Sequence, residues 1–439
     1  MEDAILIWEN TWDQALAIWT NYARLQKPVI CTTPDEEKKE AIGQGLAMIR
    51  LNDLRVVISM KNIINMGLQD YPLEILAHEI GHHICCPADL NDLARLTARV
   101  QKGLMDLAKN APMILNLYTD LLVNHHLKTE CKLPMEKIYL TISQTTENSL
   151  WAFYMRVYEI LWALPKASLA KCEISDETEA DAQLANRIIK NSGKYWIKGA
   201  GQFAVLCYSY LARDSQKTLP LFMKGLLDTM DAGSGDVFPE GILEIDEDET
   251  GEIKHPAYEL DDNFDKKTYQ EQGSKGNYRE PFQFGQILEA MGVKADSETM
   301  AMAYYKQRAL PYLIPFPRET QQSHSDPLPE GLNTWDAGSP FSQIDWFESI
   351  SRSPVLIPGY TLFEREYGET QGSNPEILPV DLDLYIDSSG SMPNPMVNIS
   401  YLTLAGAIVA LSALRSGSRV QATLWSGVHQ VIKTEGFVR

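Results

Sequence analysis

Residues 72–84 read Pro-Leu-Glu-Ile-Leu-Ala-His-Glu-Ile-Gly-His-His-Ile, and this stretch decides the expected fold of the first half of the chain. Leucine and isoleucine recur there at spacings of three and four residues, which predicts a helix with one apolar face. Proline at its start suits the first turn of a helix. His78 and His82 are one turn apart, so they project together from another face of that helix.

The two histidines have the spacing of a metal-ligand pair, because imidazoles one helical turn apart can occupy adjacent corners of a zinc tetrahedron. Glu79 follows His78 directly and is expected to reach a water on the metal rather than the metal itself. Zinc lowers the pKa of such a water toward about 7, and a glutamate can take its proton as general base while the hydroxide attacks a carbonyl. The pattern therefore predicts a hydrolytic zinc site with Glu79 as its catalytic residue.

The pentapeptide His78-Glu-Ile-Gly-His82 and the segment before it resemble the zincin metallopeptidases. Residues 45–51 and 54–60 are rich in β-forming side chains and predict a hairpin. The resemblance implies that the strand over residues 55–60 lies above the cleft and can pair with an extended peptide substrate. Apolar spacing predicts further helices at residues 92–109, 112–127, 148–164 and 177–190.

A zinc site needs a third protein ligand, and one candidate is Glu177. Residues 177–181 read Glu-Thr-Glu-Ala-Asp. They resemble the ExxxD pattern of the gluzincin-type CAAX proteases, in which the glutamate binds zinc and the aspartate supports a ligand histidine. The closeness of this match favours Glu177 as the third ligand.

The competing candidate is Asp120, which stands four residues before Asn124. The pair resembles the D-x-x-x-N helix of bacterial predicted metallopeptidases that carry a von Willebrand factor A (VWA)-like domain at the C-terminus. The domain order of this chain favours Asp120, and either carboxylate is chemically adequate. The choice stays open, with His125, His126 or no third ligand as further alternatives.

A second motif, Asp-Ser-Ser-Gly-Ser at residues 387–391, follows a predicted strand over residues 380–386. A helix over residues 398–414 and a strand over residues 420–425 are predicted after it. Strand, loop, helix and strand in this order are typical of an α/β Rossmann-like domain. Ligands of such sheets bind outside the carboxyl ends of the strands, where this motif lies.

The motif resembles the D-x-S-x-S signature of VWA domains. This resemblance implies that Asp387, Ser389 and Ser391 form the first loop of a metal-ion-dependent adhesion site (MIDAS), whose hard oxygen ligands suit Mg²⁺. It covers only residues 380–439, and the threonine and aspartate that later loops supply in the family have no match here. We therefore expect a truncated VWA domain with a partial magnesium site.

Composition limits the classes of function. The 439 residues, 44% of them hydrophobic, are enough for several folded domains. A net charge of −20 argues against nucleic acid as a partner. Six irregularly spaced cysteines fit a reducing cytoplasm, and neither a signal peptide nor an apolar run of about 20 residues is visible. The sequence therefore predicts a cytoplasmic protein without a membrane or nucleic-acid partner.

The expected architecture is multidomain: a mainly α, zincin-like (α+β) domain followed by the start of an α/β Rossmann-like VWA domain. Between residues 244 and 265 there are ten carboxylates and one lysine, which predicts a solvated linker. In the Pro-rich region that follows, Trp335 and Trp346 are expected to anchor part of the chain by packing. The predicted domains are the metallopeptidase domain (1–230), an acidic linker and helical segment (231–310), the Pro-rich joining region (311–379) and the partial VWA domain (380–439).

Bacterial proteins with this domain combination often accompany MoxR-type AAA+ ATPases, and the resemblance implies such a partner. Two functions remain open. The chain is either a zinc-dependent metallopeptidase that acts on peptides or proteins and is coupled to a VWA interaction domain, or a non-catalytic metal-binding adaptor or co-chaperone for the ATPase. The intact Glu79 favours the enzyme, because a zinc ion that only stabilises the fold needs no base beside it.

Overall fold

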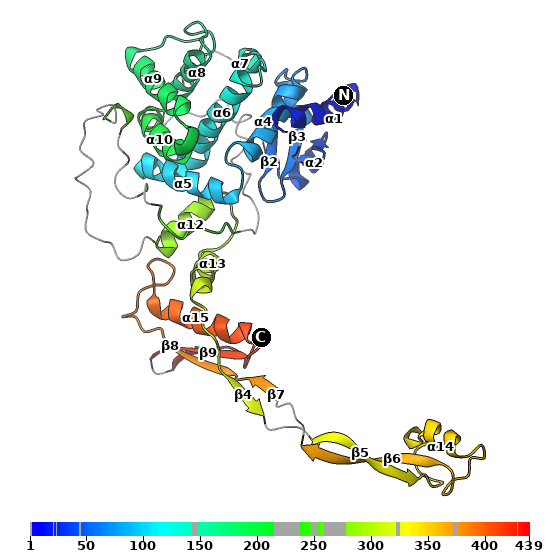
Figure 1. Cartoon of the computed structure of the whole chain (residues 1–439). Helices are drawn as coiled ribbons and strands as arrows, with labels where there is room; N and C mark the ends of the chain where they lie inside the picture. The colour runs from blue at the N-terminus through cyan, green and yellow to red at the C-terminus, as the bar shows by residue number, and fades with distance from the viewer. Residues whose placement is uncertain are drawn as a thin grey trace. The chain divides into compact units, whose positions relative to one another are not determined.

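The computed structural model describes residues 2–20, 22, 24–43, 45–142, 148–214, 238–246, 249, 253, 255–258, 278–321, 325–371, 376–427 and 429–439. It is a mixed α/β protein, about 53% helical, with small sheets (Figure 1). The chain divides into two compact units, Met1–Arg308 with Pro393–Ser400 and Ala309–Met392 with Tyr401–Arg439. No helix in the described ranges is both long and apolar enough to cross a membrane.

A small sheet opens the first unit. Its strands are β1 (Val29–Cys31), β2 (Ala47–Arg50) and β3 (Arg55–Ser59). The central strand β3 pairs in parallel with β1 and antiparallel with β2, so β2 and β3 form the predicted hairpin. Val56, Val57 and Ile58 of β3 are fully buried. A continuous run of β-branched side chains suits a strand that is covered on both faces.

The position of β3 corrects one expectation. The strand over residues 55–60 was predicted to pair with substrate, but β1 and β2 already occupy both of its edges. Within the described ranges, no strand pairs with the outer edge of β2. The Ser59 N–H donates to the Leu46 carbonyl at 2.9 Å. By the alternation of an antiparallel ladder, the backbone groups of Ala47 and Ile49 therefore point away from β3.

Helices form most of the first unit (Figure 1). Their bounds are α1 (Glu2–Trp19), α2 (Pro34–Lys39), α3 (Met60–Asn65), α4 (Pro72–Ile84), α5 (Leu90–Leu104), α6 (Ala111–Thr129), α7 (Met135–Ile142), α8 (Ser149–Leu161), α9 (Asp176–Lys190), α10 (Trp196–Arg213), α12 (Pro281–Ala290) and α13 (Ser297–Ala309). The four further helices expected from apolar spacing correspond to α5, α6, α8 and α9. The first of those predictions runs past α5 into a 3₁₀ helix, Met105–Asn110.

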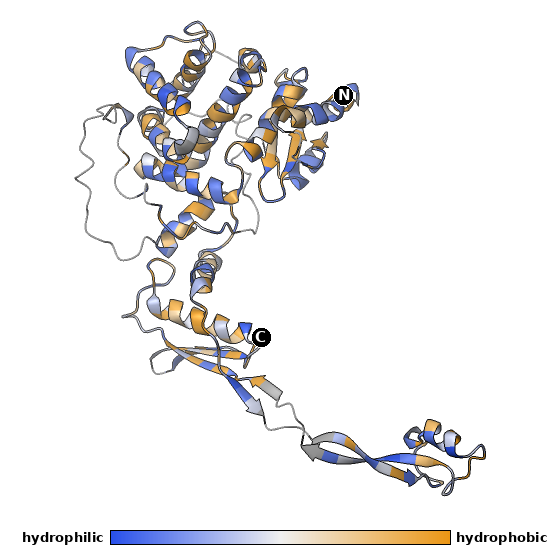
Figure 2. Cartoon of the chain, viewed as in Figure 1, coloured by the Kyte–Doolittle hydropathy of each residue, from blue (hydrophilic) through white to orange (hydrophobic). Residues whose placement is uncertain are grey.

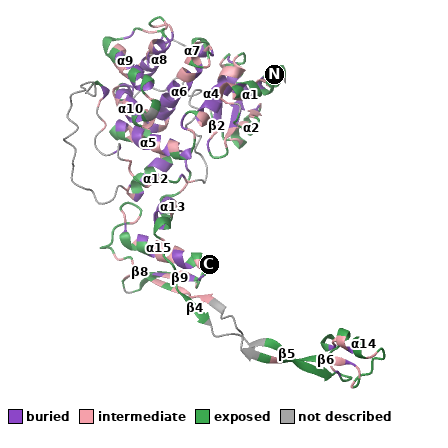
Figure 3. Cartoon of the chain, viewed as in Figure 1, coloured by how far each residue is buried: buried purple, intermediate pink, exposed green. Residues whose placement is uncertain are grey.

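Helix α4, which carries the histidine pair, packs against α1, α6 and β2. All residues from Ile75 to His82 are buried (Figure 3). Gly81 allows this close packing, because a Cβ atom there would lie 2.5 Å from the Trp19 ring and 2.6 Å from the Val123 side chain. The Trp19 indole N–H in turn donates to the Ala77 carbonyl at 2.6 Å. The glycine of the motif is thus required by packing.

The predicted acidic linker packs on the first unit where the structure describes it, which corrects the expectation of a solvated segment. Asp246 accepts hydrogen bonds from Arg95 and Arg99. The carboxylate of Glu249 pairs with Arg99 and accepts two hydrogen bonds from Arg279, each of 2.6 Å. Burial lowers the pKa of Arg279 to about 10, so its guanidinium remains charged at neutral pH and needs a carboxylate partner. Residues 231–237, 247–248, 250–252, 254 and 259–277 of the predicted linker lie outside the described residues.

The second unit contains a parallel strand–helix–strand arrangement. Its elements are β8 (Leu382–Asp387), α15 (Tyr401–Arg415), β9 (Val420–Gly427) and β10 (Gln430–Lys433). The strand order is β10-β9-β8, with β8 parallel and β10 antiparallel to β9. The strand, helix and second strand predicted near the C-terminus are therefore present, and assignment to the VWA fold remains a proposal.

The Pro-rich region forms two antiparallel strand pairs. β4 (Arg318–Gln321) pairs with β7 (Glu376–Pro379), and β5 (Ser325–Thr334) pairs with β6 (Phe363–Gln371), with α14 (Trp346–Arg352) between β5 and β6. Trp335 is 3% exposed and clusters with Ile344 and Leu362, as expected of an anchor. Trp346 is 47% exposed, so the same expectation is wrong for it.

Candidate metal centre

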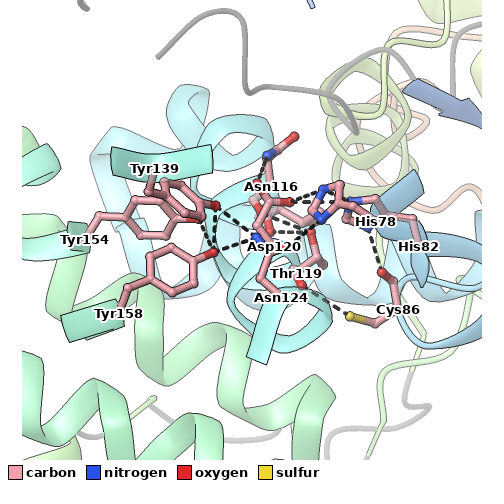
Figure 4. Close-up of polar contacts among 11 residues, drawn as sticks. His78, His82, Cys86, Asn116, Thr119, Asp120, Asn124, Tyr139, Tyr154 and Tyr158 are labelled. Carbon is pink, nitrogen blue, oxygen red and sulfur yellow. Dashed lines mark hydrogen bonds and ion pairs between the residues drawn. The ribbon is translucent and has the colours of Figure 1, made fainter. Parts of the chain in front are cut away.

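His78 and His82 of α4 and Asp120 of α6 meet in the interior of the first unit (Figure 4). The two histidine Nε2 atoms are 3.1 Å apart. The Asp120 Oδ1 atom lies 3.7 Å from Nε2 of His78 and 3.4 Å from Nε2 of His82. This group can hold a metal ion.

The spacing of these three donor atoms fits a small tetrahedral ion. Metal–nitrogen bonds of about 2.0–2.1 Å in a tetrahedron place neighbouring ligand atoms about 3.3–3.4 Å apart. The observed separations of 3.1, 3.4 and 3.7 Å bracket that value. Three electron-rich atoms at such distances repel one another unless a cation, either a proton or a metal ion, lies among them.

The second nitrogen of each imidazole fixes the tautomer that a metal requires. Nδ1 of His82 lies 2.9 Å from the Cys86 carbonyl oxygen, which can only accept, so this nitrogen donates. Nδ1 of His78 lies 2.7 Å from Oδ1 of Asn124. With both protons on Nδ1, both Nε2 lone pairs face Asp120, which is the arrangement of metal-bound histidines.

Asn124 is oriented by a buried cluster of tyrosine hydroxyl groups (Figure 4). Its Nδ2 atom donates to Tyr139 and to Tyr158, each at 2.9 Å, which leaves Oδ1 to accept from His78. The hydroxyls of Tyr139 and Tyr154 both lie 3.0 Å from that of Tyr158. Burial, with the nearby Asp120 charge as a further cause, raises the pKa of Tyr158 and keeps its hydroxyl protonated. The cluster therefore holds His78 in its metal-binding tautomer.

Asp120 is positioned by its own helix. Asn116 donates from Nδ2 to Oδ2 of Asp120 at 3.0 Å, so Oδ1 turns to the histidines. Asn116, Asp120 and Asn124 follow one another at intervals of four residues and share one face of α6. All three are buried, on a helix whose other buried residues are mostly apolar. This polar stripe is the sequence signal that would have identified Asn116 as part of the site, and sequence reasoning missed it.

Glu79 lines a cavity beside the ligand group. The cavity is partly open to solvent and leaves about 50 Å³ for the centres of water-sized molecules. Glu79 itself is 2% exposed. The lining combines groups of the centre with apolar side chains of β2 and the neighbouring helices: Leu46, Ala47, Ile75, His78, Glu79, Asp120, Asn124, Met135, Ile138 and Tyr139. A group that enters this cavity would contact Glu79 and the metal ligands together.

The competing carboxylate, Glu177, is not part of this group. It lies in the first turn of α9, is 58% exposed and pairs with Arg213 at 2.6 Å. Asp181, its partner in the ExxxD pattern, accepts a hydrogen bond from Tyr210. Of the two candidate third ligands, the structure therefore brings Asp120 to the histidines.

His125 and His126, the other histidines considered as ligands, lie elsewhere, as does His83 beside the motif. His126 stacks on the Trp19 ring with centroids 4.8 Å apart. Burial lowers the pKa of His125, which belongs to the same turn of α6. His83 bonds through Nδ1 to the Ala88 carbonyl at 2.9 Å, a contact typical of a packed histidine at a helix end. None of the three belongs to the group of potential ligands found among the described residues.

The serine loop, residues 387–391, follows the C-terminal end of β8. The Ser389 N–H donates to Oδ1 of Asp387 at 2.8 Å. The hydroxyls of Ser389 and Ser391 are 3.1 Å apart. The three predicted residues thus lie together, and Ser391 is exposed.

Comparison of the chain with known protein families, curated proteins and solved structures gave no match. Inference about its function therefore depends on the geometry of the site.

Proposed function

We propose that the protein is a zinc-dependent metallopeptidase whose centre consists of His78, His82 and Asp120, with Glu79 as general base. One observation carries this proposal: three donor atoms converge at tetrahedral spacing, and a buried glutamate lines the cavity beside them. Two imidazoles and one carboxylate form a set found in catalytic zinc sites, where the fourth position is left for water or substrate. Four protein ligands would be expected if the metal only stabilised the fold.

A zinc ion at this position would polarise a substrate carbonyl and make a water molecule more acidic. The contributions of the chain itself follow from the contacts around it. Asn124 and the Cys86 carbonyl keep the imidazole protons on Nδ1, so the Nε2 atoms stay available. Glu79 adjoins His78 in the chain and lines the same cavity, where its carboxylate can take a proton from a nucleophile and return it to a leaving amine.

Strand β2 offers a means of aligning a peptide. Ala47 lines the cavity, and its backbone N–H and carbonyl point away from β3. An extended segment added at this edge would form main-chain hydrogen bonds beside Glu79. Backbone pairing of this kind favours a peptide or protein substrate over a small metabolite.

For the second unit we propose an interaction role. Its serine loop lies at the carboxyl end of β8, the position at which open α/β sheets bind ligands. By its resemblance to VWA domains, this face would contact a protein partner such as a MoxR-type AAA+ ATPase, with Asp387, Ser389 and Ser391 as part of a Mg²⁺ site that further ligands would complete. The alternative function, an adaptor without catalysis, shares this unit and differs only in the role of the zinc.

The experiment that tests the proposal separates metal binding from chemistry. Glu79→Gln should keep its zinc, because this side chain is not a ligand, and should lose hydrolysis of fluorescein-labelled casein by the zinc-loaded chain. Glu74→Gln is the matched control, because it is the same change on the same helix outside the cavity. Retained hydrolysis in Glu79→Gln would exclude this residue as the base. A zinc ion with four protein ligands would support the adaptor.

A further inference from the structure

The region between β5 and β6 forms a small folded body, residues 335–362, which we call the head. Its buried cluster consists of Trp335, Ile344 and Leu362. Within the described ranges, the strands that carry it pair with each other, and β6 also forms a single bridge to Ile344 of the head itself. An isolated two-stranded ribbon is marginally stable in water unless further apolar surface covers it. The head therefore has little interior of its own for its number of apolar residues.

Helix α14 of the head buries a polar side chain and exposes apolar ones, which is the reverse of an ordinary surface helix. Ser349 is fully buried, where its hydroxyl donates to the Asp345 carbonyl at 2.7 Å and accepts the Phe363 N–H at 2.8 Å. Phe347 is 80% exposed and Ile350 is 57% exposed. A helix that turns serine inward and its largest apolar side chains outward presents an interaction surface.

The exposed side chains of α14 share one face. Trp346, Phe347 and Ile350 fall within about one quarter of the helix circumference, given 3.6 residues per turn. Figure 2 shows the hydropathy of this part of the chain, and Figure 3 shows how exposed it is. Other large apolar side chains of the head are also exposed, namely Phe341, Val355, Leu356, Ile357 and Tyr360.

The amount of this surface matches an interface between proteins. Fully covered aromatic side chains bury roughly 150–250 Å² each. Four exposed aromatic residues (Phe341, Trp346, Phe347 and Tyr360) and four exposed aliphatic ones therefore reach the order of the 800 Å² that each partner buries in a standard complex. A stable dimer needs an interface of this size.

The charged groups of the head are largely neutralised within the ribbon and head. Asp345 pairs with Arg365, and Glu348 pairs with Arg352 at 2.8 Å. The apolar face can therefore meet an identical face without uncompensated like charges. We propose that the exposed apolar surface of the head, which includes Trp346, Phe347 and Ile350, docks on the same surface of a second copy of the chain to give a two-fold symmetric dimer.

Sedimentation equilibrium of the full chain over a hundredfold range of concentration tests this proposal. The mass should rise from 49.4 kDa toward twice that value as concentration increases. The double variant Phe347→Ser with Ile350→Ser should remain monomeric over the whole range. Both side chains are exposed, so the variant should fold, which circular dichroism can check. Tyr367→Ser is the control, because Tyr367 is 60% exposed on β6 outside the head and its loss should leave the dimer intact.

Three results would overturn the proposal. The parent chain could keep the monomer mass at every concentration. The double variant could dimerise as well as the parent chain, which would place the interface elsewhere. A monomeric parent chain could instead bind phosphatidylcholine vesicles through the same two residues, which would make the face a membrane contact.

Discussion

The two regions that the sequence suggests as metal sites differ in how their ligands are held. The candidate centre in the first unit draws donors from two helices, with His82 and Asp120 38 residues apart in the chain. Each donor side chain is fixed by a second hydrogen bond from its other polar atom. The serine loop draws its groups from five consecutive residues that bond mainly to one another. The first is buried and the second is largely exposed. The comparison indicates that the first is preorganised for a cation, while the second depends on contacts beyond its own loop.

Removal of a ligand from the buried centre should have the largest effect. His82→Ala or Asp120→Ala removes one of three donors, and zinc sites contribute about 10–16 kcal/mol of apparent binding free energy, so affinity should fall by roughly a thousandfold or more. Glu177→Ala is the control, because its exposed ion pair with Arg213 contributes at most about 1 kcal/mol to stability and nothing to the site. Competition with a chromophoric chelator measures both affinities. Equal zinc affinity in Asp120→Ala and the parent chain would exclude Asp120 as a ligand.

Substitution of one glycine in each region by alanine compares how tightly the two regions are packed. Gly81→Ala places a Cβ atom 2.5 Å from the Trp19 ring, whereas Gly390 of the serine loop has no neighbour within 4 Å. Overpacking should lower the free energy of unfolding by about 1–3 kcal/mol in Gly81→Ala, which exceeds the helix-propensity gain of about 1 kcal/mol. Gly390→Ala should change it by less than about 0.5 kcal/mol. Chemical unfolding curves compare the two, and an equally stable Gly81→Ala variant would contradict the packing described for α4.

Substitution of Asn124, whose amide is oriented by the tyrosine hydroxyls, should have an intermediate effect on metal affinity. Asn124→Ala removes the acceptor of the His78 Nδ1 proton, and loss of such a supporting group weakens zinc binding by about 10–100-fold. Asn124→Asp keeps an acceptor oxygen and should recover most of the affinity. Isothermal calorimetry with zinc checks both variants. If Asn124→Asp bound as weakly as Asn124→Ala, the hydrogen bond to His78 would not explain the effect.

Substitution in the serine loop should have the smallest effect on metal binding. Asp387→Ala should leave zinc content unchanged, because the loop belongs to the other unit. Mg²⁺ needs near-ideal octahedral oxygen coordination, and the loop offers only Asp387 and two serine hydroxyls, so binding should be too weak for calorimetry at physiological Mg²⁺ concentrations. Tight binding abolished by Asp387→Ala would show that the loop is as complete a site as the buried centre.

The sequence was informative where local pattern decides the structure. The helix around His78 and His82, the hairpin before it and the strand that precedes Asp387 follow from periodicity and from proline and glycine placement. The third ligand could not be chosen, because Asp120 and Glu177 both stand on helices in motif-like spacing. The stripe of Asn116, Asp120 and Asn124 was the available signal, and it becomes decisive only when all three prove to be buried.

Contacts between residues far apart in the chain explain the remaining differences between the predictions and the structure. Strand β1 has only three residues, which are too few for a periodic pattern to predict a strand. It nevertheless makes β3 the central strand of the sheet and leaves β2 at an edge. Asp246 and Glu249 belong to a segment whose charge indicates solvation. Their partners Arg95 and Arg99 lie about 150 residues earlier in the chain, and ion pairs at that separation leave no mark on composition.

X-ray absorption at the zinc edge of the zinc-loaded chain tests the central claim most directly. We expect a first shell of nitrogen and oxygen atoms at about 2.0–2.1 Å, with the outer-shell scattering of two imidazoles and no sulfur at about 2.3 Å. The imidazole scattering should decrease in His82→Ala and remain unchanged in Glu177→Ala. A spectrum with sulfur ligands, or one in which His82→Ala leaves the imidazole scattering unchanged, would contradict a centre formed by His78, His82 and Asp120.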